Sequence, residues 1–144
     1  MGRNDVSGEP LRGLHILVID DDATARDLVG GMLEHCGALV TTSGSAGAAL
    51  VSLQRVLPEL IVCALNLRTG GSAYDFVRRL RTESSLAASR IPVVAIVRDD
   101  KRHPLNEVLE AGFVGYIKAP FDPRQLCSVI ADVDDAHPRE RRTD

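Results

Sequence analysis

Charged and amide side chains follow apolar runs at four places in this chain. Asp20-Asp21-Asp22 ends the first such run, Asn66 lies just beyond a second, and Arg98 and Lys118 end two later ones. Side chains of these types could serve phosphoryl transfer to a protein carboxylate. That reaction needs a nucleophilic oxygen, a divalent cation that screens the phosphate, a fixed positive charge and a hydroxyl that senses the product. The residues at these run ends therefore decide which of the four components the chain has.

The elements that carry these residues alternate between short apolar runs and helical patterns. The runs are Leu14–Ile19, Ala38–Thr42, Leu60–Leu65, Val93–Val97 and Val114–Ile117. Apart from His15, the first, third and fourth are continuously hydrophobic, as parallel strands buried on both faces are, whereas the second is more polar, as an edge strand is. Between the runs, apolar residues recur at i, i+3, i+4 and i+7, which is helical spacing. One such set is Ala73, Phe76, Val77 and Leu80.

This alternation predicts an α/β fold with an open, doubly wound sheet and right-handed crossovers. In such sheets, functional residues gather at the carboxyl ends of the strands, which is where the polar residues above are expected. Asp122-Pro123 is typical of a helix start, and Gly37 and Gly112 are typical of helix ends. Gly30-Gly31 conflicts with the first helical pattern, at a cost of roughly 1 kcal/mol per glycine relative to alanine.

Composition favours one domain. The chain has 144 residues, of which 44% are hydrophobic, so it can build a core. We expect a flexible segment at 1–12, a folded domain at 13–133 and a charged tail at 134–144. The net charge of −3 gives no reason to expect nucleic-acid binding. The polar start of the chain does not resemble a signal peptide, and no apolar run is long enough to span a membrane.

The three cysteines show neither metal-ligand nor disulfide spacing. Cys36, Cys63 and Cys127 are therefore expected to be free thiols in a reducing cytoplasm. Cys63 neighbours Ala64 in a strand pattern, so its side chain should point to the opposite face of the sheet and serve as a core thiol.

Several motifs resemble the receiver domain of bacterial response regulators. Ile19-Asp20-Asp21, with Arg26 one helical turn on, is similar to the first strand and helix of that family. Ile91–Ile96 is similar to its fourth strand, and Gly115-Tyr116-Ile117 before Pro120-Phe121 is similar to its fifth. The resemblance covers nearly the whole folded part. It implies a flavodoxin-like (βα)5 fold with a five-stranded parallel sheet in the order 2-1-3-4-5.

The resemblance assigns the acidic residues to metal binding. Asp20 and Asp21 match the magnesium-binding acids of the family, and Asn66 matches the position whose backbone carbonyl helps to hold the ion. Without the third acid of the family, this set implies weak magnesium binding at most, and no other cofactor is expected.

Three positions lack the groups that the family uses. Ala64 stands where the phosphate-accepting aspartate is expected, Val97 where the switch serine or threonine is, and Ala119 where the lysine is. Lys118 comes one place early. Because strand side chains alternate between faces, Lys118 should point away from the site unless a local bulge rescues it. These three losses together predict a domain that does not use phosphorylation.

Asp20 and Asp21 are left without the cation that the family supplies. Two carboxylates about 5 Å apart, at an effective dielectric constant of about 20, repel by roughly 3 kcal/mol. Arg98 follows the fourth strand, where the family needs a small residue. We expect its guanidinium either to enter the pocket and replace magnesium, or to face solvent as an ordinary loop arginine.

The favoured function is that of a pseudo-receiver, a signalling module that binds proteins without aspartyl phosphorylation and is not an enzyme. The resemblance places the partner-binding face on the fourth helix, fifth strand and fifth helix, with Tyr116 as its switch aromatic. The expected partners are a histidine kinase, a phosphotransfer protein or a downstream regulator, in the cytoplasm, with no nucleic acid and no membrane. A homodimer remains open.

Two other functions are compatible with part of the sequence pattern. One is a phosphorelay response regulator with a non-standard acceptor such as Asp22, although Asp22 is better placed to cap a helix. The other is a flavodoxin-like small-ligand binder, which the chain is poorly equipped to be, because it has no phosphate-cradling loop and only 3% aromatic residues.

Overall fold

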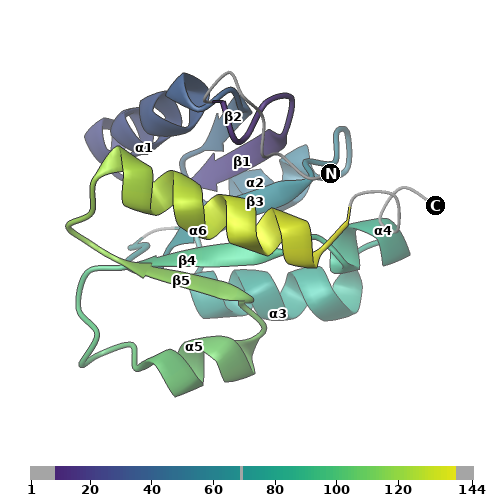
Figure 1. Ribbon diagram of the computed structural model, residues 1–144. Coiled ribbons are helices and arrows are strands. Elements are labelled where there is room, and N and C mark those ends of the chain that lie inside the picture. The colour runs from purple at the N-terminus through teal and green to yellow at the C-terminus, as the bar shows by residue number, and fades with distance from the viewer. Residues whose placement is uncertain (1–8, 69, 139–144) are drawn as a thin grey trace.

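A five-stranded parallel sheet lies at the centre of the computed structural model, which describes residues 9–68 and 70–138 (Figure 1). The strands are β1 (His15–Ile19), β2 (Leu39–Ser43), β3 (Leu60–Ala64), β4 (Val93–Val97) and β5 (Gly115–Lys118). They lie in the order β2-β1-β3-β4-β5, and every neighbouring pair is parallel. The predicted fold class and strand order are confirmed.

Helices cover both faces of this sheet. They are α1 (Ala23–His35), α2 (Ala46–Ser52), α3 (Ala73–Glu83), α4 (Leu86–Ser89), α5 (Leu105–Ala111) and α6 (Pro123–Ala136). Helices α1 and α6 pack on one face, and α3 and α5 lie on the other (Figure 1). The short α4 was not predicted; the Ser85 side chain caps it by accepting a hydrogen bond from the Ala88 N–H. Among the described residues, no helix is long and apolar enough to cross a membrane.

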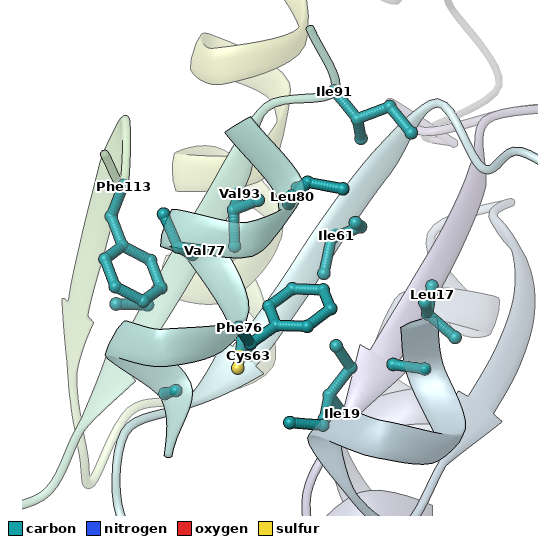
Figure 2. Close-up of a cluster of buried hydrophobic side chains, with 14 of the residues drawn as sticks. Leu17, Ile19, Ile61, Cys63, Phe76, Val77, Leu80, Ile91, Val93 and Phe113 are labelled. Carbon is teal, nitrogen blue, oxygen red and sulfur yellow. The ribbon is translucent and has the colours of Figure 1, made fainter. Parts of the chain in front are cut away.

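The hydrophobic core has two layers, one on each face of the sheet. β3 and β4 are buried at every residue, as their continuous hydrophobic sequences predict, whereas most of β2 is exposed, as an edge strand is. In one layer, strand side chains such as Ile61 and Val93 meet Phe76 and Leu80 of α3 (Figure 2). Helix α3 therefore buries the apolar stripe that its spacing predicts.

The folded part extends past both expected boundaries. Leu11, placed by sequence in the flexible segment, is fully buried, and its N–H donates to the Cys36 carbonyl at 2.9 Å. At the other end, α6 continues to Ala136, and Asp134 is buried although it was expected in the tail. The rest of the two expected end segments, residues 1–8 and 139–144, lies outside the described residues.

The expectation of three free thiols is wrong for two of them. Cys36 at the end of α1 and Cys127 in α6 form a disulfide that joins positions 91 residues apart in sequence. No sequence spacing could indicate this pair, because α1 and α6 become neighbours only when the sheet forms. Cys63 is free and fully buried in the other layer.

Local signals at the helix ends behave as predicted. Asp122 accepts a hydrogen bond from the Gln125 N–H while the Gln125 side chain accepts one from the Asp122 N–H, which completes a capping box. Gly37 and Gly112 follow α1 and α5 with φ angles of 98° and 115°, in the left-handed region that favours glycine.

Gly31 offers a direct test of helix propensity. It lies inside α1, it is exposed, and a Cβ atom built on it would meet nothing within 4 Å. We expect Gly31→Ala to stabilise the fold by about 1 kcal/mol, because alanine loses less backbone entropy in a helix. The midpoint and slope of urea denaturation measure the change.

Gly37→Ala is the matched control. Its φ is positive, and a Cβ atom there would lie 2.9 Å from the Arg12 Cα. We expect a loss of between about 1 and 3 kcal/mol. Equal changes in the free energy of unfolding for Gly31→Ala and Gly37→Ala would show that local backbone conformation does not determine either change.

Candidate functional site

Hydrogen bonds between side chains and backbone groups fix the acidic turn Asp20-Asp21-Asp22 after β1. The Asp20 N–H donates to the Ser43 carbonyl at 3.2 Å, and one Asp20 carboxylate oxygen, Oδ1, accepts from the Asp22 N–H at 3.0 Å. Asp22 in turn caps α1, because its Oδ1 accepts from the N–H groups of Thr24 and Ala25. Arg26, one turn on, donates through Nη1 to the Asp20 carbonyl at 2.7 Å. Strand, turn and helix together therefore fix where the Asp20 side chain points.

Asp20 is a buried carboxylate with a guanidinium beside it. Its side chain is 3% exposed, and its Oδ2 lies 3.6 Å from Nη2 of Arg98, which is 40% exposed. Burial raises the pKa of the Asp20 carboxyl, and repulsion from Asp21 and Asp22 adds to the increase. The hydrogen bond from Asp22 and the charge of Arg98 act in the opposite direction. The structure thus places Arg98 at ion-pair distance from one of the two acids.

Asp21 has a different partner, which sequence reasoning missed. The backbone N–H of Arg68, in the loop after β3, donates to Asp21 Oδ2 at 2.6 Å, and the Arg68 Nε lies 3.8 Å from the same oxygen. Arg68 stands where the receiver pattern has proline, and proline has no N–H to donate. The replacement of proline by Arg68 was the sequence signal for this contact, because a residue other than proline is needed to donate the backbone hydrogen bond to Asp21.

The three positions that depart from the receiver pattern carry no reactive group. Ala64 is the last residue of β3, and since Ile19 pairs with Cys63, Asp20 and Ala64 are the next residues on adjacent strands. Ala64 is 1% exposed and Val97 is fully buried in the hydrophobic core. Ala119 is half-buried and packs on the α1–α6 side of the sheet. No oxygen or nitrogen nucleophile stands at any of these side chains.

Lys118, the last residue of the edge strand β5, forms an ion pair with Asp100. β5 pairs with β4 in continuous register from Gly115 to Lys118, without the bulge that could have turned this side chain. The Lys118 Nζ lies 3.0 Å from Asp100 Oδ2 in the β4–α5 loop, and both side chains are about half exposed. That bond lowers the pKa of the Asp100 carboxyl.

The donor set does not fit a strong magnesium site. Asp20 Oδ2 and Asp21 Oδ1 are buried and accept no hydrogen bond within the described residues, so two oxygens of the right type are available. However, Arg98 lies 3.6 Å from Asp20, and Ala64, which the receiver resemblance places where a third acid is expected, offers no side-chain ligand atom. Residues 9–68 and 70–138 contain no group of three or more histidine, cysteine, aspartate or glutamate side chains placed to hold a metal. Asn66 is exposed on the loop after β3.

Tyr116 lies beside a surface groove. The ring is half-buried against the core layer that α3 and α5 cover. Together with Lys118, Phe121 and Arg124 it lines a groove of about 610 Å3 between β5 and α6. This groove opens on the face that the receiver resemblance assigns to partner binding.

The chain is similar to known receiver proteins over most of its length. A family model described as response regulator receiver domain matches residues 16–131. An uncharacterised 14.6 kDa protein from the sodA1 3′ region of Leptolyngbya boryana is 36% identical over 124 residues, which cover 85% of this chain and 91% of that protein. The phosphate regulon transcriptional regulatory protein PhoB of Escherichia coli K12 is 32% identical over 118 residues, 82% of this chain but only 50% of PhoB.

Solved structures agree on the fold. The chemotaxis response regulator CheY4 of Vibrio cholerae superposes with a TM-score of 0.74 at 21% sequence identity, covering 84% of this chain and 98% of CheY4. At this level of identity, the likeness concerns the arrangement of strands and helices.

Asp20 and Arg98 should be energetically coupled. We expect Arg98→Met to lower the free energy of unfolding at pH 7 by about 1 kcal/mol, because it leaves a buried carboxylate without its countercharge. In the Asp20→Asn background the same substitution should cost nothing, and a double-mutant cycle by urea denaturation measures the difference. Arg68→Met is the matched control: the guanidinium that it removes is 78% exposed and its backbone N–H still donates to Asp21, so stability should hardly change. Additive effects of Asp20→Asn and Arg98→Met would contradict the coupling.

The raised pKa of Asp20 predicts a pH dependence of stability. The folded protein binds the Asp20 carboxyl proton more tightly than the unfolded chain, in which the carboxyl has its ordinary pKa of 3.8. The ionisation of Asp20 therefore lowers the free energy of unfolding as the pH rises from 3.8 through the raised pKa of the folded state. Asp20→Asn removes that cost. We expect its gain over wild type to be largest near neutral pH and to shrink as the pH falls towards 4, as urea denaturation across this range would measure. A gain that grows on acidification would show that the pKa is lowered instead.

Proposed function

The chain belongs to the response regulator receiver domain family, and from this premise we propose that it is a two-component signalling module that binds protein partners without being phosphorylated. The proposal is supported above all by the end of β3, where buried Ala64 occupies the position that the receiver resemblance assigns to the phosphate acceptor. A methyl group has no lone pair to attack phosphorus, and no environment can supply one.

An arginine side chain and a backbone hydrogen bond can compensate the two acids without metal or phosphate. On this proposal, the Arg98 guanidinium stands in for magnesium at Asp20, and the Arg68 N–H stabilises Asp21. Arginine suits the task because it stays charged at every physiological pH. The same positive charge would repel magnesium and occupy room that a phosphoryl group needs.

Three contacts fix the β4–α5 loop, which favours one conformation of the face formed by α5, β5 and α6, the signalling face. Arg98 reaches Asp20, and Asp100 bonds Lys118. Further on, the His103 Nδ1 and the Tyr74 hydroxyl lie 3.0 Å apart. Because this loop leads into α5, these contacts hold α5 without a phosphate-driven switch. Any change of the face would then come from a partner that selects a conformation.

We assign partner binding to the face formed by α5, β5 and α6. Its groove combines Tyr116 and Phe121 with Arg124, and aromatic residues and arginine are the side-chain types enriched in protein interfaces. A histidine kinase, a phosphotransfer protein or a downstream regulator in the cytoplasm is the proposed partner, and a second copy is the alternative. The chain spans about half of PhoB, so the activity of such a longer regulator is not transferred to it.

Wild-type protein should remain unmodified by phosphodonors. We expect no stable mass gain of a phosphoryl group after incubation with acetyl phosphate and magnesium, as read by intact mass spectrometry. A stable gain would overturn the proposal and point to a non-standard acceptor such as Asp22, which peptide mapping would identify.

Ala64→Asp should restore part of the chemistry and none of the switching. The new carboxylate supplies the acceptor and a third metal ligand, so we expect measurable magnesium binding and partial phosphorylation. Ala64→Asn, of nearly equal size, is the control and should gain neither. Because Val97 and Ala119 remain, phosphorylated Ala64→Asp should show the same hydrogen exchange around Tyr116 as its unmodified form. Protection changes across α5, β5 and α6 would show that the other two positions are not needed.

A further inference from the structure

We propose that Cys36 and Cys127 form a reversible oxidation site whose disulfide controls the mobility of α6, and through it the groove beside Tyr116. The inference rests on the proposed function for two points, the role of the groove as a partner-binding surface and the reducing compartment in which the disulfide would be transient. The chemistry of the site and the response of α6 stand on the disulfide alone.

The two cysteines meet where the end of α1 touches α6. Cys36 is the C-cap residue of α1, and its Cα lies 6.8 Å from that of Cys127, within the reach of a disulfide. The same Cys127 sulfur also lies 3.8 Å from the carbonyl of Met32, one turn earlier in α1. Figure 1 shows the two helices side by side on one face of the sheet.

The exposure of the two sulfur-bearing residues gives the reaction an order. Cys36 is half-buried, whereas Cys127 is only 3% exposed. A low-molecular-weight disulfide such as glutathione disulfide would react first with the Cys36 thiolate to give a mixed disulfide and one glutathione. The Cys127 thiolate would then attack the Cys36 sulfur, form the Cys36–Cys127 bond and release the second glutathione. The two electrons lost by the cysteines end on the two glutathione thiols, which also carry the two protons.

Cys63 provides an internal reference for this chemistry. It is fully buried in the opposite core layer, and burial raises the pKa of its thiol. The reactive thiolate is therefore disfavoured at Cys63, and no second cysteine lies in its layer among the described residues. It should stay reduced while the other two cycle.

Helix α6 connects the oxidation site to the groove. One side of the helix carries Cys127 and packs on the sheet through Leu126, Ile130 and Val133. Another side, with Arg124, Gln125, Ser128 and Val129, lines the groove opposite Tyr116. Reduction would leave the apolar contacts and the capping box in place, so α6 should stay helical. It would lose the covalent tie to α1, and with it the restraint that the cross-link places on local opening.

A disulfide in a cytoplasmic signalling protein is expected to be transient and regulatory, because cytoplasmic thiol buffers reduce persistent ones. The oxidised form would present a more rigid groove than the reduced form. A partner that must order α6 on binding would therefore prefer the oxidised form.

The test compares the full chain after equilibration with glutathione disulfide and after reduction with dithiothreitol. Alkylation in denaturant followed by intact mass should count one free thiol in the oxidised form and three in the reduced form. Hydrogen exchange should be slower in α6 of the oxidised form, by about tenfold or more. Cys63→Ser should keep this difference, and Cys36→Ser should abolish it.

Three outcomes would overturn the proposal. One is a count of three free thiols after oxidation, and another is a cross-link that dithiothreitol does not reverse in the folded protein. The third is equal exchange of α6 in the two forms. The comparison of oxidised and reduced wild type needs no variant to fold, and it involves no phosphodonor. Its failure is therefore separate from a failure of the proposed function.

Discussion

The buried carboxyl group of Asp20 is the constraint on which the rest of the site depends. A buried carboxylate is costly unless charge or hydrogen bonds compensate it. Here the Asp22 N–H and the Arg98 guanidinium do so, and the raised pKa shows that the compensation is incomplete. Perturbed carboxyl pKa values of this kind are common at functional sites.

The two acids are compensated in different ways, which has consequences for the fold around them. Asp20 forms an ion pair with the Arg98 side chain at the end of β4, whereas Asp21 accepts a hydrogen bond from the Arg68 backbone in the loop after β3. The pocket therefore ties together the loops after β1, β3 and β4, the three central strands of the sheet. On our proposal, these fixed contacts replace the network that magnesium and phosphate form and break in a switching receiver. The signalling face is then set by folding and, on our further inference, adjusted by oxidation at α6.

The sequence predicted much of this architecture because its signals are local. Continuous apolar runs located β1, β3 and β4 to within a residue or two, and Asp22 and Asp122 cap the helices they precede. The interactions that were missed join distant segments: the Arg68 N–H with Asp21, Lys118 with Asp100, and Cys36 with Cys127. Each depends on where folding brings two loops or helices together, which composition and periodicity do not encode. The departure from proline at position 68 was visible, but its meaning needed the partner oxygen.

The central claim is that the domain holds one signalling conformation without phosphate. Amide NMR spectra of the wild-type chain, recorded with and without magnesium and the phosphoryl mimic beryllofluoride, test it most directly. Our account predicts that the two spectra superimpose, including the resonances of Tyr116 and its neighbours in β5. Saturable shifts that spread from the end of β3 to α5, β5 and α6 would contradict it, because they would show that the pocket still drives the signalling face.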